Sequence, residues 1–136
     1  MVDALRRTHD VLMPDGVVID VHPTVEPAAV EVGGETVGHV ATEDAPQRHA
    51  AADAAVRAVV DDGLFGVEHI AHFDFYTYGD SIEELRDYIG ENWRNARIDD
   101  VVVQRAHASL LPTAPGVKPR VRERVRLTQL RRLAPR

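Results

Sequence analysis

Two ionisable residues near the end of the first apolar run have the types and the spacing for acid–base chemistry. Asp20 and His22 stand two positions apart in the segment 17–22, so on a strand their side chains share one face. A carboxylate that orients an imidazole is the arrangement of a general base. A hydrogen-bonded pair at a strand end explains the same residues, and Pro23 directly afterwards is a strand-stop signal. Asp20 and His22 are therefore candidate catalytic residues, with the structural alternative left open.

The remaining histidines do not have the spacing of metal ligands. His69 and His72 are three residues apart on an expected strand, so they face opposite sides. His39, His49 and His107 fall in three different expected elements. The chain has no cysteine, which rules out thiolate ligands and disulfides. We expect no metal site.

A group of aromatic residues lies between positions 73 and 93. Its members include Phe73, Phe75, Tyr76, Tyr78 and Trp93. Such residues line ligand pockets and interfaces, and they also fill cores. Tyr76, Tyr78 and Trp93 are the candidates for a ligand or interface site, while the core between the long strand and its helix is the alternative.

Arginine alternates with other residues near the C-terminus. Arg120, Arg122, Arg124 and Arg126 have the period of two that places side chains on one face of a strand. This pattern is one signature of a nucleic-acid surface. No aromatic residues are interleaved with it, and the rest of the chain is acidic, so we favour a structural role. The expected partners are helix carboxylates such as Glu84, Asp87 and Glu91.

The elements that must position these residues follow from periodicity and from turn residues. Helices are expected at 3–12, 44–62, 81–93 and 99–110, strands at 17–22, 64–78 and 118–130, a β-hairpin at 28–42 and a loop at 112–116. Ser81 followed by Glu84 forms a capping box, and the helix that it begins carries Ile82, Leu85, Ile89 and Trp93 on one face. The continuous β-branched run at 17–22 predicts a strand buried on both faces, as in a parallel sheet. The fold class is therefore α/β, with a small mixed sheet and flanking helices.

The order of these elements resembles the C-terminal half of a class I S-adenosylmethionine-dependent methyltransferase domain. Such domains place a helix and a Leu-x-Pro-Gly-Gly turn before their fifth strand, and the matching segment is Leu12-Met13-Pro14-Asp15-Gly16 leading into residues 17–20. The family then adds a helix and an antiparallel pair of closing strands, to which residues 64–78 and 118–130 correspond. The resemblance implies a Rossmann-like arrangement over nearly the whole chain.

The same resemblance shows what this chain lacks. The family's cofactor site needs a Gly-rich loop after the first strand and an acidic residue after the second. Gly33-Gly34 lies in a hairpin context without a following helix, so no cofactor-binding residue is assigned and no cofactor is expected. The chain is thus expected to act without autonomous catalysis, as a binding or assembly module. A half sheet exposes an edge and a face, which predicts a homodimer or a partner that supplies the missing half.

Two other functions stay open from the sequence. One is a methyltransferase-related enzyme whose site is completed at a dimer or partner interface by Asp20, His22 and the tyrosines. The other is a nucleic-acid-associated protein that uses the Arg-rich strand. No Gly-x-Ser-x-Gly nucleophile or Gly-x-x-x-x-Gly-Lys loop is present.

Length and charge set the outer bounds of these interpretations. The 136 residues fit one domain over 1–136, and 44% hydrophobic content is ordinary for a folded protein. The net charge of −6 divides into +7 over residues 117–136 and −13 over the rest. The chain shows neither a signal-peptide pattern nor an apolar run of about 20 residues, so we expect a cytoplasmic protein without membrane contact.

Overall fold

The computed structural model describes residues 1–111 and 115–135. Its described helices are α1 (Val2–Val11), α2 (Ala45–Asp61), α3 (Ile82–Asn92) and α4 (Asp100–Leu110). Its described strands are β1 (Val17–Pro23), β2 (Ala29–Val32), β3 (Glu35–His39), β4 (Ala41–Thr42), β5 (Phe65–Tyr78), β6 (Ala96–Arg97) and β7 (Arg120–Arg132). This is an α/β fold with a small antiparallel sheet, which confirms the expected fold class. Most of the loop expected at 112–116 lies outside the described residues.

The chain forms two compact units. Unit 1 holds Met1–Val25, Pro46–Phe73 and Val125–Arg136, and unit 2 holds Glu26–Ala45 and Asp74–Arg124. The long strands β5 and β7 contribute residues to both. The expectation of one domain over residues 1–136 stays a prediction.

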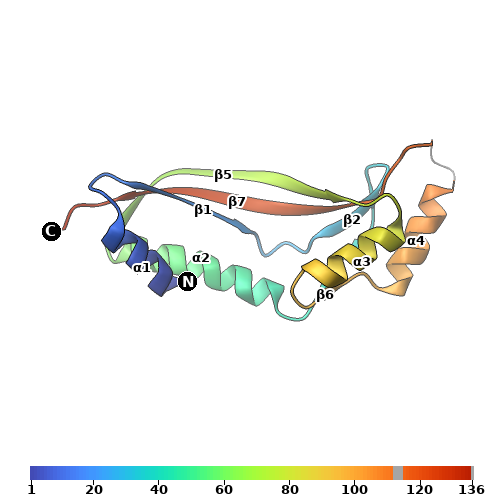
Figure 1. The fold of residues 1–136 in the computed structure, drawn as a ribbon, viewed down its shortest axis with the longest axis horizontal. Coiled ribbons are helices and arrows are strands. Elements are labelled where there is room, and N and C mark those ends of the chain that lie inside the picture. Colours follow the sequence, from blue (N-terminus) through green and yellow to red (C-terminus); the bar gives the residue numbers. More distant parts are fainter. Residues whose placement is uncertain (112–114, 136) are drawn as a thin grey trace. The chain divides into compact units, whose positions relative to one another are not determined.

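In unit 1, β1 pairs with the C-terminal part of β7, and helices cover one face of the strands. The pairing is antiparallel and runs from Val17 opposite Arg131 to Pro23 opposite Val125. Both α1 and α2 lie on the same side of β1, β5 and β7 (Figure 1). The core between the layers contains Leu5, Ala55, Val56, Val59, Phe65 and Leu130.

The prediction of a strand buried on both faces at 17–22 is wrong. Among the described strands, β1 pairs only with β7 and forms the end of the sheet order β1-β7-β2-β3. Val17, Ile19 and Val21 are 38%, 51% and 51% exposed, while the residues between them are half-buried. The β-branched run predicts a strand correctly, but in the described part of the chain helices cover only one face of it.

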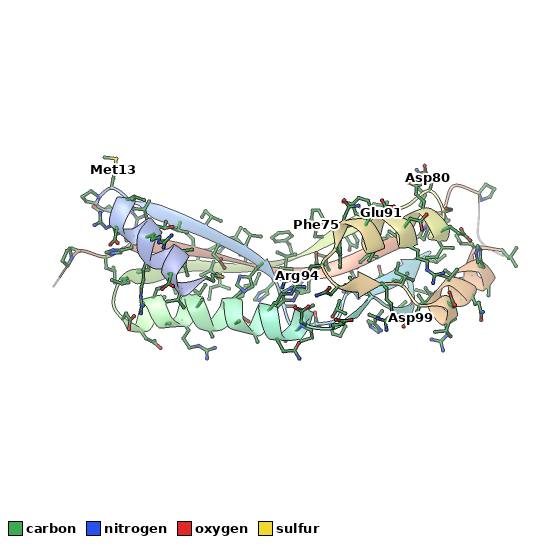
Figure 2. The ribbon with its side chains drawn as sticks, turned by 60° about the horizontal axis from the view of Figure 1, so that its bottom comes forward. Met13, Phe75, Asp80, Glu91, Arg94 and Asp99 are labelled. Carbon is green, nitrogen blue, oxygen red and sulfur yellow. The ribbon has the colours of Figure 1, made fainter. Side chains whose placement is uncertain are left out.

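The turn before β1 forms where the sequence predicts it. The amide of Gly16 donates to the carbonyl of Met13 at 2.9 Å, and Asp15 has a positive φ of 60°. A Cβ at position 16 would come within 2.8 Å of the Met13 carbonyl oxygen, so the turn requires glycine there. Met13 itself is 78% exposed and projects away from the ribbon (Figure 2).

Unit 2 is built on the predicted hairpin. In it, β2 and β3 pair antiparallel around Gly33 and Gly34, whose φ values of 59° and 83° suit a type I′ turn. The side chain of Ser81 accepts a hydrogen bond from the Glu84 amide at 3.1 Å, which confirms the cap of α3. Of the predicted stripe, Ile82, Leu85 and Ile89 are fully buried in the core of this unit, and Trp93, directly after α3, packs against it.

The strands β5 and β7 pair with each other, as expected for residues 64–78 and 118–130. In unit 1 the Leu133 amide donates to the Leu64 carbonyl at 3.0 Å, and in unit 2 the Gly79 amide donates to the Pro119 carbonyl at 3.1 Å. From the first bond to the second, the residue number rises along β5 and falls along β7, so the two strands run antiparallel. None of the helices in the described part of the chain is long and apolar enough to cross a membrane.

Candidate functional site

The structure joins Asp20 and His22 to a third residue that the sequence analysis did not name. Both side chains lie on the helix-facing side of β1, and His22 Nδ1 is 2.6 Å from Asp20 Oδ2. His22 Nε2 is 2.6 Å from Oδ1 of Asp53, which comes from α2. Asp20 and His22 side chains are each 11% exposed, and that of Asp53 is 28% exposed. The imidazole therefore lies between two carboxylates and ties α2 to β1.

A sequence signal for Asp53 existed in the pattern of α2. The residue stands three and seven positions before Val56 and Val60, so the three share one helix face. Val56 is buried in the unit 1 core and Val60 packs against it. An aspartate on an apolar helix face needs a donor nearby, and His22 supplies it.

The geometry limits what His22 can do chemically. Each ring nitrogen of His22 already has a carboxylate oxygen at 2.6 Å, Asp20 Oδ2 at Nδ1 and Asp53 Oδ1 at Nε2. Both nitrogens are therefore engaged within the protein, and neither is free to bond a substrate. General-base chemistry at His22 would require Asp53 to move away from Nε2.

A small pocket adjoins this cluster within unit 1. Its volume is about 150 Å³, and its polar lining includes His22, Asp53, Arg57, Arg126 and Thr128. Arg126 Nη1 is 3.7 Å from Asp53 Oδ1, while the buried Nε of Arg126 has no hydrogen-bond partner among the described residues. The pocket thus combines an engaged carboxylate with an unengaged donor.

Two other histidines make contacts of their own, and His49 also interacts electrostatically with His22 and Asp53. In unit 1, His49 Nδ1 donates to the Thr24 carbonyl at 3.0 Å, and burial lowers the pKa of His49. In unit 2, His107 Nε2 contacts the carboxylate of Glu83. Among the described residues, no group of histidine and carboxylate side chains has the arrangement to hold a metal ion.

The arginines of β7 pair with carboxylates, but not with those expected. Arg120 and Arg122 donate from Nε to the two oxygens of Glu31 on β2, at 3.0 and 2.8 Å. Arg124 donates to Asp74 on β5 at 3.3 Å, and Arg126 contacts Asp53. The prediction of Glu84, Asp87 and Glu91 as partners is wrong, because the arginine face of β7 meets its neighbouring strands and α2.

Glu31 is the most buried of these partners. Its side chain is only 6% exposed. Burial by itself raises the pKa of Glu31, and the hydrogen bonds and charges of Arg122 and Arg120 outweigh it, so the pKa lies below its ordinary value. The paired guanidinium groups keep this carboxylate ionised inside unit 2.

The aromatic candidates do not form one cluster. The rings of Tyr76 and Tyr78 are 6.2 Å apart, and the guanidinium of Arg120 lies 4.2 Å from the centre of the Tyr76 ring. Phe75 is also exposed on β5 (Figure 2). Trp93, in contrast, packs against the hydrophobic core of unit 2.

Replacing Asp53 tests the histidine bridge. We expect Asp53→Ala to lower the free energy of unfolding by about 1–3 kcal/mol, because it leaves His22 Nε2 without its hydrogen-bond partner. The matched control Asp61→Ala removes the same side chain from an exposed position of α2 and should change stability by less than about 0.5 kcal/mol. Urea unfolding at neutral pH measures both, and equal effects would show that the bridge contributes no stability.

The Glu31 pair gives a prediction about pH. The folded-state pKa is depressed, so its stabilisation is complete above the unfolded value of about 4.3 and is lost as pH falls through the folded value. We expect Glu31→Gln to be less stable than the parent by about 1–3 kcal/mol at pH 7, with the gap narrowing as the pH falls below 4.3. Urea midpoints between pH 7 and pH 3 measure it, with exposed Glu35→Gln as control. A gap independent of pH would contradict the depressed pKa.

Comparison with known proteins finds no relative on which to base a function. No protein-family model, curated protein or solved structure matches the chain significantly. The function has therefore to be inferred from the chain's own surfaces and sites.

Proposed function

We propose that this chain is the closing part of a methyltransferase-like fold and acts as a homodimeric binding or assembly module, without a complete catalytic site of its own. The observation that carries the proposal is the unpaired edge of β1. This strand bonds to β7 on one edge, and no described strand pairs with its other edge. An unpaired edge is a template for another strand.

The exposed face of β1 adds an apolar contact to that edge. Val17, Ile19 and Val21 point away from the helices and are between 38% and 51% exposed. Adjacent exposed apolar residues on a strand favour association. In the methyltransferase resemblance, β1 corresponds to the fifth strand, whose second edge pairs with a strand of the family's front half.

The sequence of β1 suits pairing with a second copy of itself. In an antiparallel pair centred on Ile19, Val17 faces Val21 of the other copy and Ile19 faces its own counterpart. Asp20 then faces Val18, so no like charges stand directly opposite each other. Pro23, which has no N–H, ends the pairing.

The enzyme alternative is supported by the contact of Asp20 with His22. It requires a partner to release Nε2 from Asp53, so it depends on assembly as well. Asp20 and His22 belong to unit 1, whereas Tyr76 and Tyr78 belong to unit 2. The nucleic-acid alternative has less support, because the four arginines of the β7 face each contact a carboxylate.

Sedimentation measures the proposed dimer. We expect the parent chain to be dimeric at micromolar concentration, and Ile19→Lys to be monomeric because a charge would be buried in the interface. Val11→Lys places the same side chain on an 82% exposed position of α1 and should stay dimeric. A parent chain that remains monomeric at roughly 100 μM would reject the homodimer.

Calorimetric titration with S-adenosylmethionine tests the statement about catalysis. The sequence provides neither the Gly-rich loop nor the ribose-binding acid of the family's site. We therefore expect no saturable heat from either the parent chain or Ile19→Lys. Saturable binding in the micromolar range would contradict the proposal, and binding by the parent alone would favour a site completed at the dimer interface.

A further inference from the structure

The small pocket beside His22 has a chemistry that the assembly proposal does not use. It lies on the helix-facing side of β1, because His22 alternates with Ile19 and Val21 along the strand. We propose that this pocket binds a small monocarboxylate with a short apolar tail.

The polar side of the pocket has more donors than acceptors. The buried Nε of Arg126 donates to no group in the described part of the chain. Arg57 lines the same pocket from α2 and forms no hydrogen bond or ion pair with other described residues. The carboxylate of Asp53 is already engaged by His22 at 2.6 Å. Two guanidinium groups that lack full partners favour an anionic ligand, and a carboxylate matches their planar geometry.

The remaining walls select for an apolar tail. Val56 and Val60 from α2 and Val67 and Ile70 from β5 line the pocket. Apolar walls with a few placed donors are the usual composition of a ligand site. The same walls disfavour inorganic phosphate, which would lose hydration on entering.

The size of the pocket limits the ligand to a short chain. A volume of about 150 Å³ corresponds to about five water molecules of liquid. Butyrate, with about six non-hydrogen atoms, is close to this limit, which is well below the size of a nucleoside. The predicted ligand is therefore a carboxylate of roughly four carbons.

Titration by nuclear magnetic resonance tests this site on the full chain labelled at valine and isoleucine methyl groups. We expect butyrate to give saturable shifts at Val56, Val60, Val67 and Ile70, with a Kd in the millimolar range. Butan-1-ol should bind about tenfold more weakly, because it lacks the charge. Butylammonium has the same chain and the opposite charge, and it should give no saturable shift at these residues.

Three variants identify the groups that bind the carboxylate. We expect Arg57→Gln to weaken butyrate binding about tenfold, and Arg126→Lys to do the same because it keeps the charge but removes the Nε donor. Arg7→Gln removes an exposed charge from α1 and should leave binding unchanged. Arg57 is also exposed, so its replacement leaves the fold intact.

Three results would overturn the inference. The first is tighter binding of butylammonium than of butyrate, which would make Asp53 the dominant group. The second is an equal effect of Arg57→Gln and Arg7→Gln on butyrate binding. The third is the absence of saturable shifts at roughly 100 mM butyrate. All three can be measured on monomeric Ile19→Lys, so the test does not depend on the dimer.

Discussion

The backbone hydrogen bonds of β7 are the interaction on which the rest of the structure depends. In unit 1 this strand pairs with β1, and in unit 2 it pairs with β2. It also pairs with β5. A backbone group removed from water has to find a partner, so β7 fixes the register of β1 within unit 1 and that of β2 within unit 2. The first register positions Asp20 and His22, and the second positions Glu31.

The alternation of arginine along β7 is a consequence of its central place. Every second residue of an inner strand lies on one face, where it contacts side chains of both neighbouring strands. Here those neighbouring side chains are the acidic Glu31 and Asp74. Glu31 is the clearest example of this charge pairing. A carboxylate with a 6% exposed side chain is stable only because two guanidinium groups each donate to one of its oxygens. The basic C-terminal segment therefore neutralises acidic residues of the same chain before any external anion does.

One-sided coverage of β1 connects the fold with both proposals. Because α1 and α2 lie on the same side, one face holds a core, a histidine bridge and a pocket, while the other leaves Val17, Ile19 and Val21 exposed. The covered face has the fixed geometry that ligand recognition needs. The open face and free edge have the properties of an association surface. Because side chains alternate between the two faces of β1, adjacent residues of this strand belong to the ligand pocket and to the association surface in turn.

The sequence by itself determined the elements, because their signals are local. The turn residues Pro14 to Gly16, the cap at Ser81 and the apolar stripe of α3 all act over a few positions, and each predicted its element correctly. It also placed Asp20 and His22 on one face. Only the tertiary structure decided that β1 is an edge strand, that Asp53 joins His22, and that Glu31 receives the arginines. These facts depend on which strands pair and on which face a helix covers. His22 and Asp53 are 31 positions apart and Glu31 and Arg122 are 91 apart, and contacts over such distances leave no periodic pattern in the sequence.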